Sequence, residues 1–104
     1  MEKENCCGHR VKERSTAEYK DLINRLNRIE GQVRGIKKMV ENNAYCPDVL
    51  VQSAAVSAAM SSFNRELLSD HIRTCVVRDI QSGDADTVNE SITELLKILQ
   101  RLMK

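Results

Sequence analysis

A histidine and a cysteine lie four residues apart in the segment DHIRTC, where His71 precedes Cys75. On a helix, residues at this spacing lie on one face, one turn from each other. Imidazole nitrogens and thiolate sulfurs are both good ligands for transition metals. The segment therefore predicts two metal ligands that point the same way, and a third ligand has to come from elsewhere.

Cys46 is the candidate for that third ligand. Pro47 suits the first turn of a helix and no helix breaker follows until Gly83, which predicts one helix over residues 47–82. Cys46 and His71 are then about 37 Å apart along the helix axis. One chain cannot place both on one metal ion, whereas two such helices packed antiparallel bring Cys46 of one chain beside the His-Cys pair of the other.

A patch of small side chains marks the expected crossing point. The position halfway between residues 46 and 71 is 58.5, and that between 46 and 75 is 60.5, within the sequence SAAMSS. Small side chains let two helix backbones approach closely. Ligand spacing and small-residue patch are independent features, and both predict an antiparallel helical dimer with two equal sites.

Two thiolates and one imidazole form a soft ligand set, which favours Cu(I), whereas zinc usually takes a fourth ligand. Two other interpretations remain open. One is a buried histidine with two structural cysteines; the other is a thiol sensor, in which Cys46 and Cys75 of different chains become linked by a disulfide or polysulfide. The N-terminal sequence CCGH adds Cys6, Cys7 and His9, for which an accessory or incidental role is expected.

Three helices are expected to position these residues, and no segment alternates as a strand does. STAE predicts a capping box at Ser15, ahead of a first helix with apolar residues at alternating steps of four and three. GDAD predicts a turn and an N-cap before the third helix. The expected all-α fold has helices over residues 16–42, 47–82 and 86–103, in a single domain of residues 15–104 that follows a disordered tail of residues 1–14.

Composition narrows the class of protein. The chain has 104 residues, of which only 3% are aromatic, so a single copy has few large side chains for a core and an oligomer is expected. No apolar run has the length of a membrane span, and the polar start is not a signal peptide, which predicts a cytoplasmic protein with reduced cysteines and no membrane partner. No acid–base pair or substrate pocket is legible, so the chain is not expected to be an enzyme.

Basic residues gather on the first expected helix. Residues 1–43 hold ten Lys or Arg against seven Asp or Glu, and residues 44–104 hold six against eight. The candidates for binding DNA phosphates are Arg25, Arg28, Arg34, Lys37 and Lys38. Gly31 and Gly35 on the same helix cost roughly 1 kcal/mol each relative to alanine, which suggests close approach to phosphates or to another helix. A solvated charged face is the plainer interpretation.

Three segments, RLNRIEGQVRGIKKMVENNAYC, DVLVQSAAVSAAM and LLSDHIRTCVVRDI, resemble the copper-sensing operon repressor (CsoR) family of metal-sensitive transcriptional repressors. The similarity runs over about residues 21–83. It implies an all-helical homodimer of three-helix chains that pairs into a dimer-of-dimers tetramer. It also implies a repressor that binds operator DNA when metal-free and releases it on binding Cu(I), with a copper chaperone as candidate metal donor.

The family's copper ligands fall on Cys46, His71 and Cys75. Tyr45 matches a position next to the ligands, and the resemblance implies a glutamate of the third helix at another, with Glu90 as the first choice and Glu94 as the alternative. Arg25 matches a DNA-binding position. Related branches that sense nickel, cobalt, formaldehyde or persulfide carry other ligand sets, so copper fits best. The alternatives are a persulfide sensor, a sensor of another transition metal, and a copper carrier that does not bind DNA.

Overall fold

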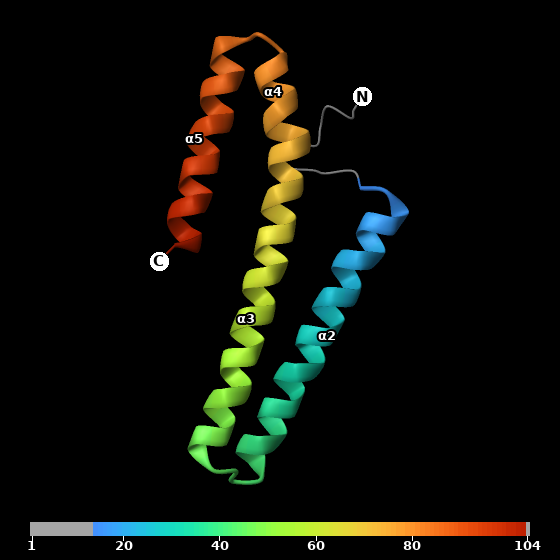
Figure 1. The fold of residues 1–104 in the computed structure, drawn as a ribbon, viewed down its shortest axis with the longest axis vertical. Coiled ribbons are helices and arrows are strands. Elements are labelled where there is room, and N and C mark those ends of the chain that lie inside the picture. The colour runs from blue at the N-terminus through green and yellow to red at the C-terminus, as the bar shows by residue number, and fades with distance from the viewer. Residues whose placement is uncertain (1–13, 104) are drawn as a thin grey trace. The chain divides into compact units, whose positions relative to one another are not determined.

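The computed structural model describes residues 14–103, and all of their regular structure is helical (Figure 1). The elements are α2 (Thr16–Glu41), α3 (Cys46–His71), the π-helical turn η1 (Ile72–Val76), α4 (Val77–Gln81) and α5 (Ala85–Leu102). The predicted all-α, three-helix chain is confirmed for these residues. They form two compact units, residues 14–67 and residues 68–103. The expected single domain and the oligomer stay predictions, and the expected tail lies outside the described residues except for Arg14.

The first unit holds α2 and most of α3, which run antiparallel in Figure 1. The predicted capping box is confirmed, because the Ser15 side chain accepts from the Glu18 backbone N–H and the Glu18 carboxylate accepts from the Ser15 backbone N–H. At the other end of α2, Asn43 adopts φ +58°, and the next backbone N–H, of Ala44, donates to the Met39 carbonyl at 2.9 Å. This is a Schellman C-cap, and asparagine is one of the few residues other than glycine that tolerates its left-handed position.

The second unit folds α5 back onto the helix that precedes it. Gly83 takes φ +77°, which a residue with a side chain rarely adopts, and so reverses the chain between α4 and α5. Asp84 then caps α5 by accepting from the Thr87 backbone N–H at 3.0 Å, as GDAD predicts. Helix α5 contacts both η1 and α4. The buried residues of the described chain are Cys75, Val76 and Ser91, and all three belong to this unit.

Within the helix predicted over residues 47–82, the hydrogen-bond pattern changes at residues 72–76. There the helix widens into a π turn, in which the Val77 backbone N–H donates to the Ile72 carbonyl, five residues earlier. The backbone dihedral angles of His71 and Val77 on either side are α-helical. The helical path therefore continues without a break, but the hydrogen-bond register changes inside the segment that carries the candidate ligands.

Large apolar side chains remain uncovered in the first unit. Leu50 is 67% exposed, Val51 64% and Val40 61%, and neither α2 nor α3 contains a buried residue. Exposed apolar area of this kind is unfavourable in water and is typical of surfaces at which proteins contact other molecules. None of the helices in residues 14–103 combines the length and hydropathy needed to cross a bilayer.

Candidate metal centre

Cys46 begins α3, and its side chain is exposed. The first turn is formed without strain, because the Tyr45 carbonyl accepts from the backbone N–H groups of Asp48 and Val49, at 3.0 Å and 3.2 Å. Pro47 has no N–H that would need an acceptor there. The thiol lines an open and mostly apolar hollow together with Val40, Asn43, Ala44, Val49 and Leu50. The Cys46 sulfur is thus accessible from the surface of its unit.

His71 and Cys75 lie at the junction of α3 and η1. The Nε2 atom of His71, the last residue of α3, is buried and has no hydrogen-bond partner in the described part of the chain. Cys75 lies within η1 and is 0% exposed. A buried polar atom without a partner is unfavourable, and a bound metal ion would satisfy the lone pair of this nitrogen. The orphaned imidazole nitrogen, four residues from a buried sulfur, fits a pair of metal ligands.

The described part of one chain does not hold a complete site. Across residues 14–103, no three side chains among His, Cys, Asp and Glu form a group that could hold a metal ion. Cys46 and His71 are the first and last residues of α3, whose 26 residues make a helix about 39 Å long. The site shared between two chains, which the sequence predicts, stays a prediction.

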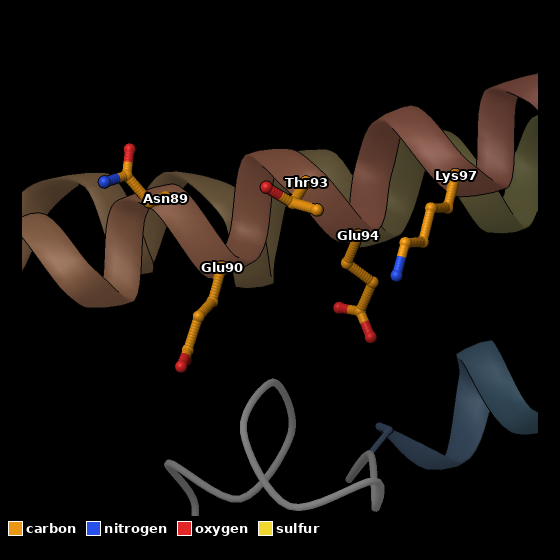
Figure 2. A pocket seen from close by; sticks show the side chains of 5 residues that line it. All are labelled: Asn89, Glu90, Thr93, Glu94 and Lys97. Atoms are coloured by element: carbon orange, nitrogen blue, oxygen red, sulfur yellow. The ribbon is translucent and has the colours of Figure 1, made fainter.

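The two glutamates of α5 lie one turn apart. Figure 2 shows the side chains of Glu90 and Glu94 extending from the same side of the helix, in a hollow lined by Asn89, Glu90, Thr93, Glu94 and Lys97. Glu90 is exposed and Glu94 half-buried. Tyr45, the other residue expected beside the ligands, is 73% exposed. All three expected roles stay predictions; the exposed ring of Tyr45 is available to a partner chain.

The five basic residues expected to bind DNA lie on α2, and they differ in whether an acidic side chain pairs with them. Arg25 donates through Nε to the Asp21 carboxylate at 3.1 Å, and Arg34 lies 3.9 Å from the Glu30 carboxylate. Exposed pairs one turn apart such as these contribute only about 0.3–0.5 kcal/mol, so a phosphate can compete with the carboxylate. The other three, Arg28, Lys37 and Lys38, are exposed. These basic side chains are distributed around α2, and their role in DNA binding stays a prediction.

Sequence reasoning missed the hydroxyl group of Thr74. This group donates to the Asp70 backbone carbonyl at 2.8 Å and also lies 3.6 Å from the sulfur of Cys75. A threonine beside a candidate ligand in the middle of a predicted helix was the available signal, because threonine hydroxyls often bond the carbonyl four residues earlier.

Comparison with known proteins places the whole helical region in one group. A family model described as metal-sensitive transcriptional repressor matches residues 18–101. The copper-sensing transcriptional repressor CsoR of Bacillus subtilis is 48% identical over 105 aligned positions, which cover 100% of this chain and 99% of the relative. The copper-sensing transcriptional repressor RicR of Mycobacterium tuberculosis is 44% identical over 68 positions, covering 65% of this chain and 71% of the relative.

Two solved structures share the fold. The copper-sensing repressor CsoR with Cu(I) from Geobacillus thermodenitrificans superposes with a TM-score of 0.83 at 39% identity, covering 90% of this chain and 95% of that chain. The nickel-responsive transcriptional regulator InrS superposes with a TM-score of 0.69 at 38% identity, covering 90% of this chain and 99% of that chain. Relatives with this fold thus respond to more than one metal.

Proposed function

Because the chain belongs to the CsoR family of metal-sensitive transcriptional repressors, we propose that it is a Cu(I)-responsive repressor. It binds operator DNA in its metal-free form and releases the DNA when Cu(I) is bound. The family is one of repressors and not of enzymes. A repressor works in the compartment that holds the operator, which agrees with the cytoplasmic location and reduced thiols expected from the sequence. A copper chaperone remains the candidate metal donor.

The observation that carries the choice of metal site is the buried, unpartnered Nε2 of His71 four residues from the buried Cys75. Cys46 of a second chain supplies the third ligand. The resulting set of two thiolates and one imidazole is soft and three-coordinate, which suits Cu(I). Tyr45 and Glu90, or Glu94, stand next to these ligands and hold them in place.

The exposed apolar surface of α3 supports the proposal that a second chain packs against it. The exposed Leu50 and Val51 lie in the first half of α3, and the small residues Ser57, Ala58 and Ser61 in its centre are also exposed. Two antiparallel copies of α3 that cross there bury this surface, because small side chains permit close approach of the backbones. Each dimer then holds two equal metal sites, and two dimers pair into a tetramer.

Coupling between copper and DNA follows from linkage. A metal ion held by two chains stabilises the arrangement of the dimer in which its three ligands meet. If that arrangement differs from the one that fits the operator, copper lowers DNA affinity, and DNA lowers copper affinity by the same factor. The basic residues of α2, which are Arg25, Arg28, Arg34, Lys37 and Lys38, supply the phosphate contacts.

The test is a DNA-binding titration of the full chain. A duplex is first selected from a random-sequence pool by the metal-free protein, and its affinity is then measured by fluorescence anisotropy with and without one equivalent of Cu(I) per chain. We expect copper to weaken binding at least tenfold for the wild type and to have no effect on His71→Ala. Unchanged affinity of the copper-loaded wild type contradicts the proposal.

The same titration with two other additives distinguishes the copper sensor from a nickel sensor and from a thiol sensor. Ni(II) in place of Cu(I) tests the metal to which the related InrS responds; two soft sulfur ligands predict a weaker response to nickel than to copper. Sulfide or a mild oxidant in place of a metal tests a thiol sensor, which is favoured by the exposure of Cys46. A thiol sensor would keep its response in His71→Ala and form an adduct between chains that mass spectrometry detects.

A further inference from the structure

Arg25 is the charged residue on the partly covered side of α2. The half-buried residues of this helix lie three, four or seven positions apart, which places them along one side of it, and they are Leu22, Arg25, Leu26, Ile29, Ile36 and Met39. A long basic side chain in such a place lays its aliphatic stem against apolar neighbours and extends its charged end to water. The side chain of Arg25 is 36% exposed, against 70% for that of Arg34. Its stem is therefore the more restricted of the two.

The charged end of Arg25 is also held, at one of its three nitrogens. The Nε atom donates to the Asp21 carboxylate, one turn earlier, at 3.1 Å. A guanidinium group has five N–H donors, of which Nε carries one and the two Nη groups carry four. Two parallel Nη donors match two oxygens of a phosphate. The bond to Asp21 thus orients the guanidinium group and leaves the Nη donors for a phosphate.

The second acidic–basic pair of α2 has the same spacing and a different geometry. Arg34 approaches the Glu30 carboxylate through Nη1 at 3.9 Å, which is beyond hydrogen-bond distance. Both side chains are well exposed, and an exposed pair without a hydrogen bond does not fix the direction of either group. One helix therefore carries a held arginine, Arg25, and a loosely paired one, Arg34, which serves as an internal comparison.

We propose that Asp21 is a positioning residue for DNA binding, which holds Nε of Arg25 so that the Nη groups meet a backbone phosphate. A side chain that is fixed before binding loses less conformational freedom when it contacts its ligand. This inference rests on the proposed function, because it takes Arg25 as a phosphate contact. The competing explanation is a pair that only stabilises α2, as acidic and basic residues at this spacing commonly do.

The two explanations predict opposite effects on DNA affinity. Phosphates repel a nearby carboxylate, so removal of an acidic side chain beside bound DNA ordinarily strengthens binding. If Asp21 only stabilises the helix, its removal leaves DNA affinity unchanged or raises it. If Asp21 positions Arg25, its removal lowers DNA affinity even though the repulsion is lost.

The experiment is a double-mutant cycle of Asp21→Ala and Arg25→Ala in the full metal-free chain, with affinity for the selected duplex measured by fluorescence anisotropy. Glu30→Ala, which removes the partner of the loosely paired Arg34, is the matched control. Arg25→Lys keeps the positive charge but has neither the Nε donor nor the planar fork. Thermal unfolding of each variant, followed by circular dichroism, reports the stability of the chain separately.

We expect Asp21→Ala and Arg25→Lys each to weaken DNA binding by about threefold or more, and Glu30→Ala to bind as tightly as the wild type or more tightly. In a chain that already carries Arg25→Ala, Asp21→Ala should cause no further loss. Wild-type affinity of Asp21→Ala overturns the inference, and so does an equal loss with and without Arg25. If Asp21→Ala does not fold, Arg25→Lys decides, because unchanged affinity of that variant contradicts an oriented guanidinium group.

Failure of the inference and failure of the proposed function give different results. If the metal-free wild type selects no duplex, the proposed function is wrong and the inference falls with it. If Arg25→Ala binds the duplex as tightly as the wild type, the proposed contact of Arg25 is wrong, and so is the inference. If Arg25→Ala weakens binding while Asp21→Ala does not, the contact stands and only the role of Asp21 is refuted.

Discussion

A mixture of two defective chains should recover copper binding that neither has alone. In the proposed dimer each site takes Cys46 from one chain and His71 with Cys75 from the other. A chain with Cys46→Ala paired with a chain with Cys75→Ala forms one intact site, to which the first chain gives His71 and Cys75 and the second gives Cys46. The other site of the same dimer lacks both thiolates.

The size of the recovery follows from random pairing. With equal amounts of the two chains, half of the dimers are mixed, and each mixed dimer has one intact site of two, so the mixture should bind about one quarter of the copper of the wild type. A site within one chain predicts no recovery.

The assay needs exchange of subunits and a stringent wash. The two variants are unfolded together, refolded under reducing conditions, loaded with Cu(I) and freed of weakly held metal with a Cu(I) chelator, after which copper per chain is determined by elemental analysis. Each variant refolded alone is the control. A mixture that holds no more copper than its parents refutes the bridging site.

Three further outcomes test other parts of the account. Arg28→Ala should weaken binding to the selected duplex and lower the slope of log affinity against log salt by about one, since it removes one phosphate contact; anisotropy titrations over a range of salt measure this. Gly31→Ala and Gly35→Ala should each raise the stability of metal-free protein by roughly 1 kcal/mol, because an added Cβ meets nothing within 4 Å in the chain; a loss of stability would indicate that a partner helix approaches there. Asp84→Ala should lower the midpoint of thermal unfolding near neutral pH. The side-chain and backbone hydrogen bonds from Thr87 lower the pKa of Asp84 below its usual 3.8, so this contribution is present above pH 3.8 and should vanish as the pH falls through the lowered value.

Local chemistry made much of the fold predictable. Ser15 with Glu18 forms a capping box, Asn43 occupies the left-handed position that ends α2, and Asp84 caps α5, because each of these residues satisfies backbone groups within a few positions of itself. The all-α fold follows from such ends together with the apolar periodicity between them. Contacts of this range depend on the sequence nearby and on little else.

The π turn could not be predicted in the same way. α-Helical hydrogen bonds join residues four apart, and those of a π turn join residues five apart. The change from one to the other needs no helix-breaking residue, and the apolar series around Cys75 and Val76 is compatible with either pattern. The sequence also did not predict which of the two cysteines, Cys46 or Cys75, is buried. Cys46 is exposed, whereas Cys75 is buried in η1, an element that α5 contacts from later in the sequence, and burial by such distant segments is not legible in the local pattern.

The coordination of copper in the loaded wild type tests the central claim most directly. X-ray absorption at the copper edge, on protein that carries one Cu(I) per chain, should show a three-coordinate metal with two sulfur ligands and one nitrogen ligand. In His71→Ala the nitrogen contribution should disappear. A site with only sulfur ligands, or a nitrogen signal that survives in His71→Ala, would contradict the account.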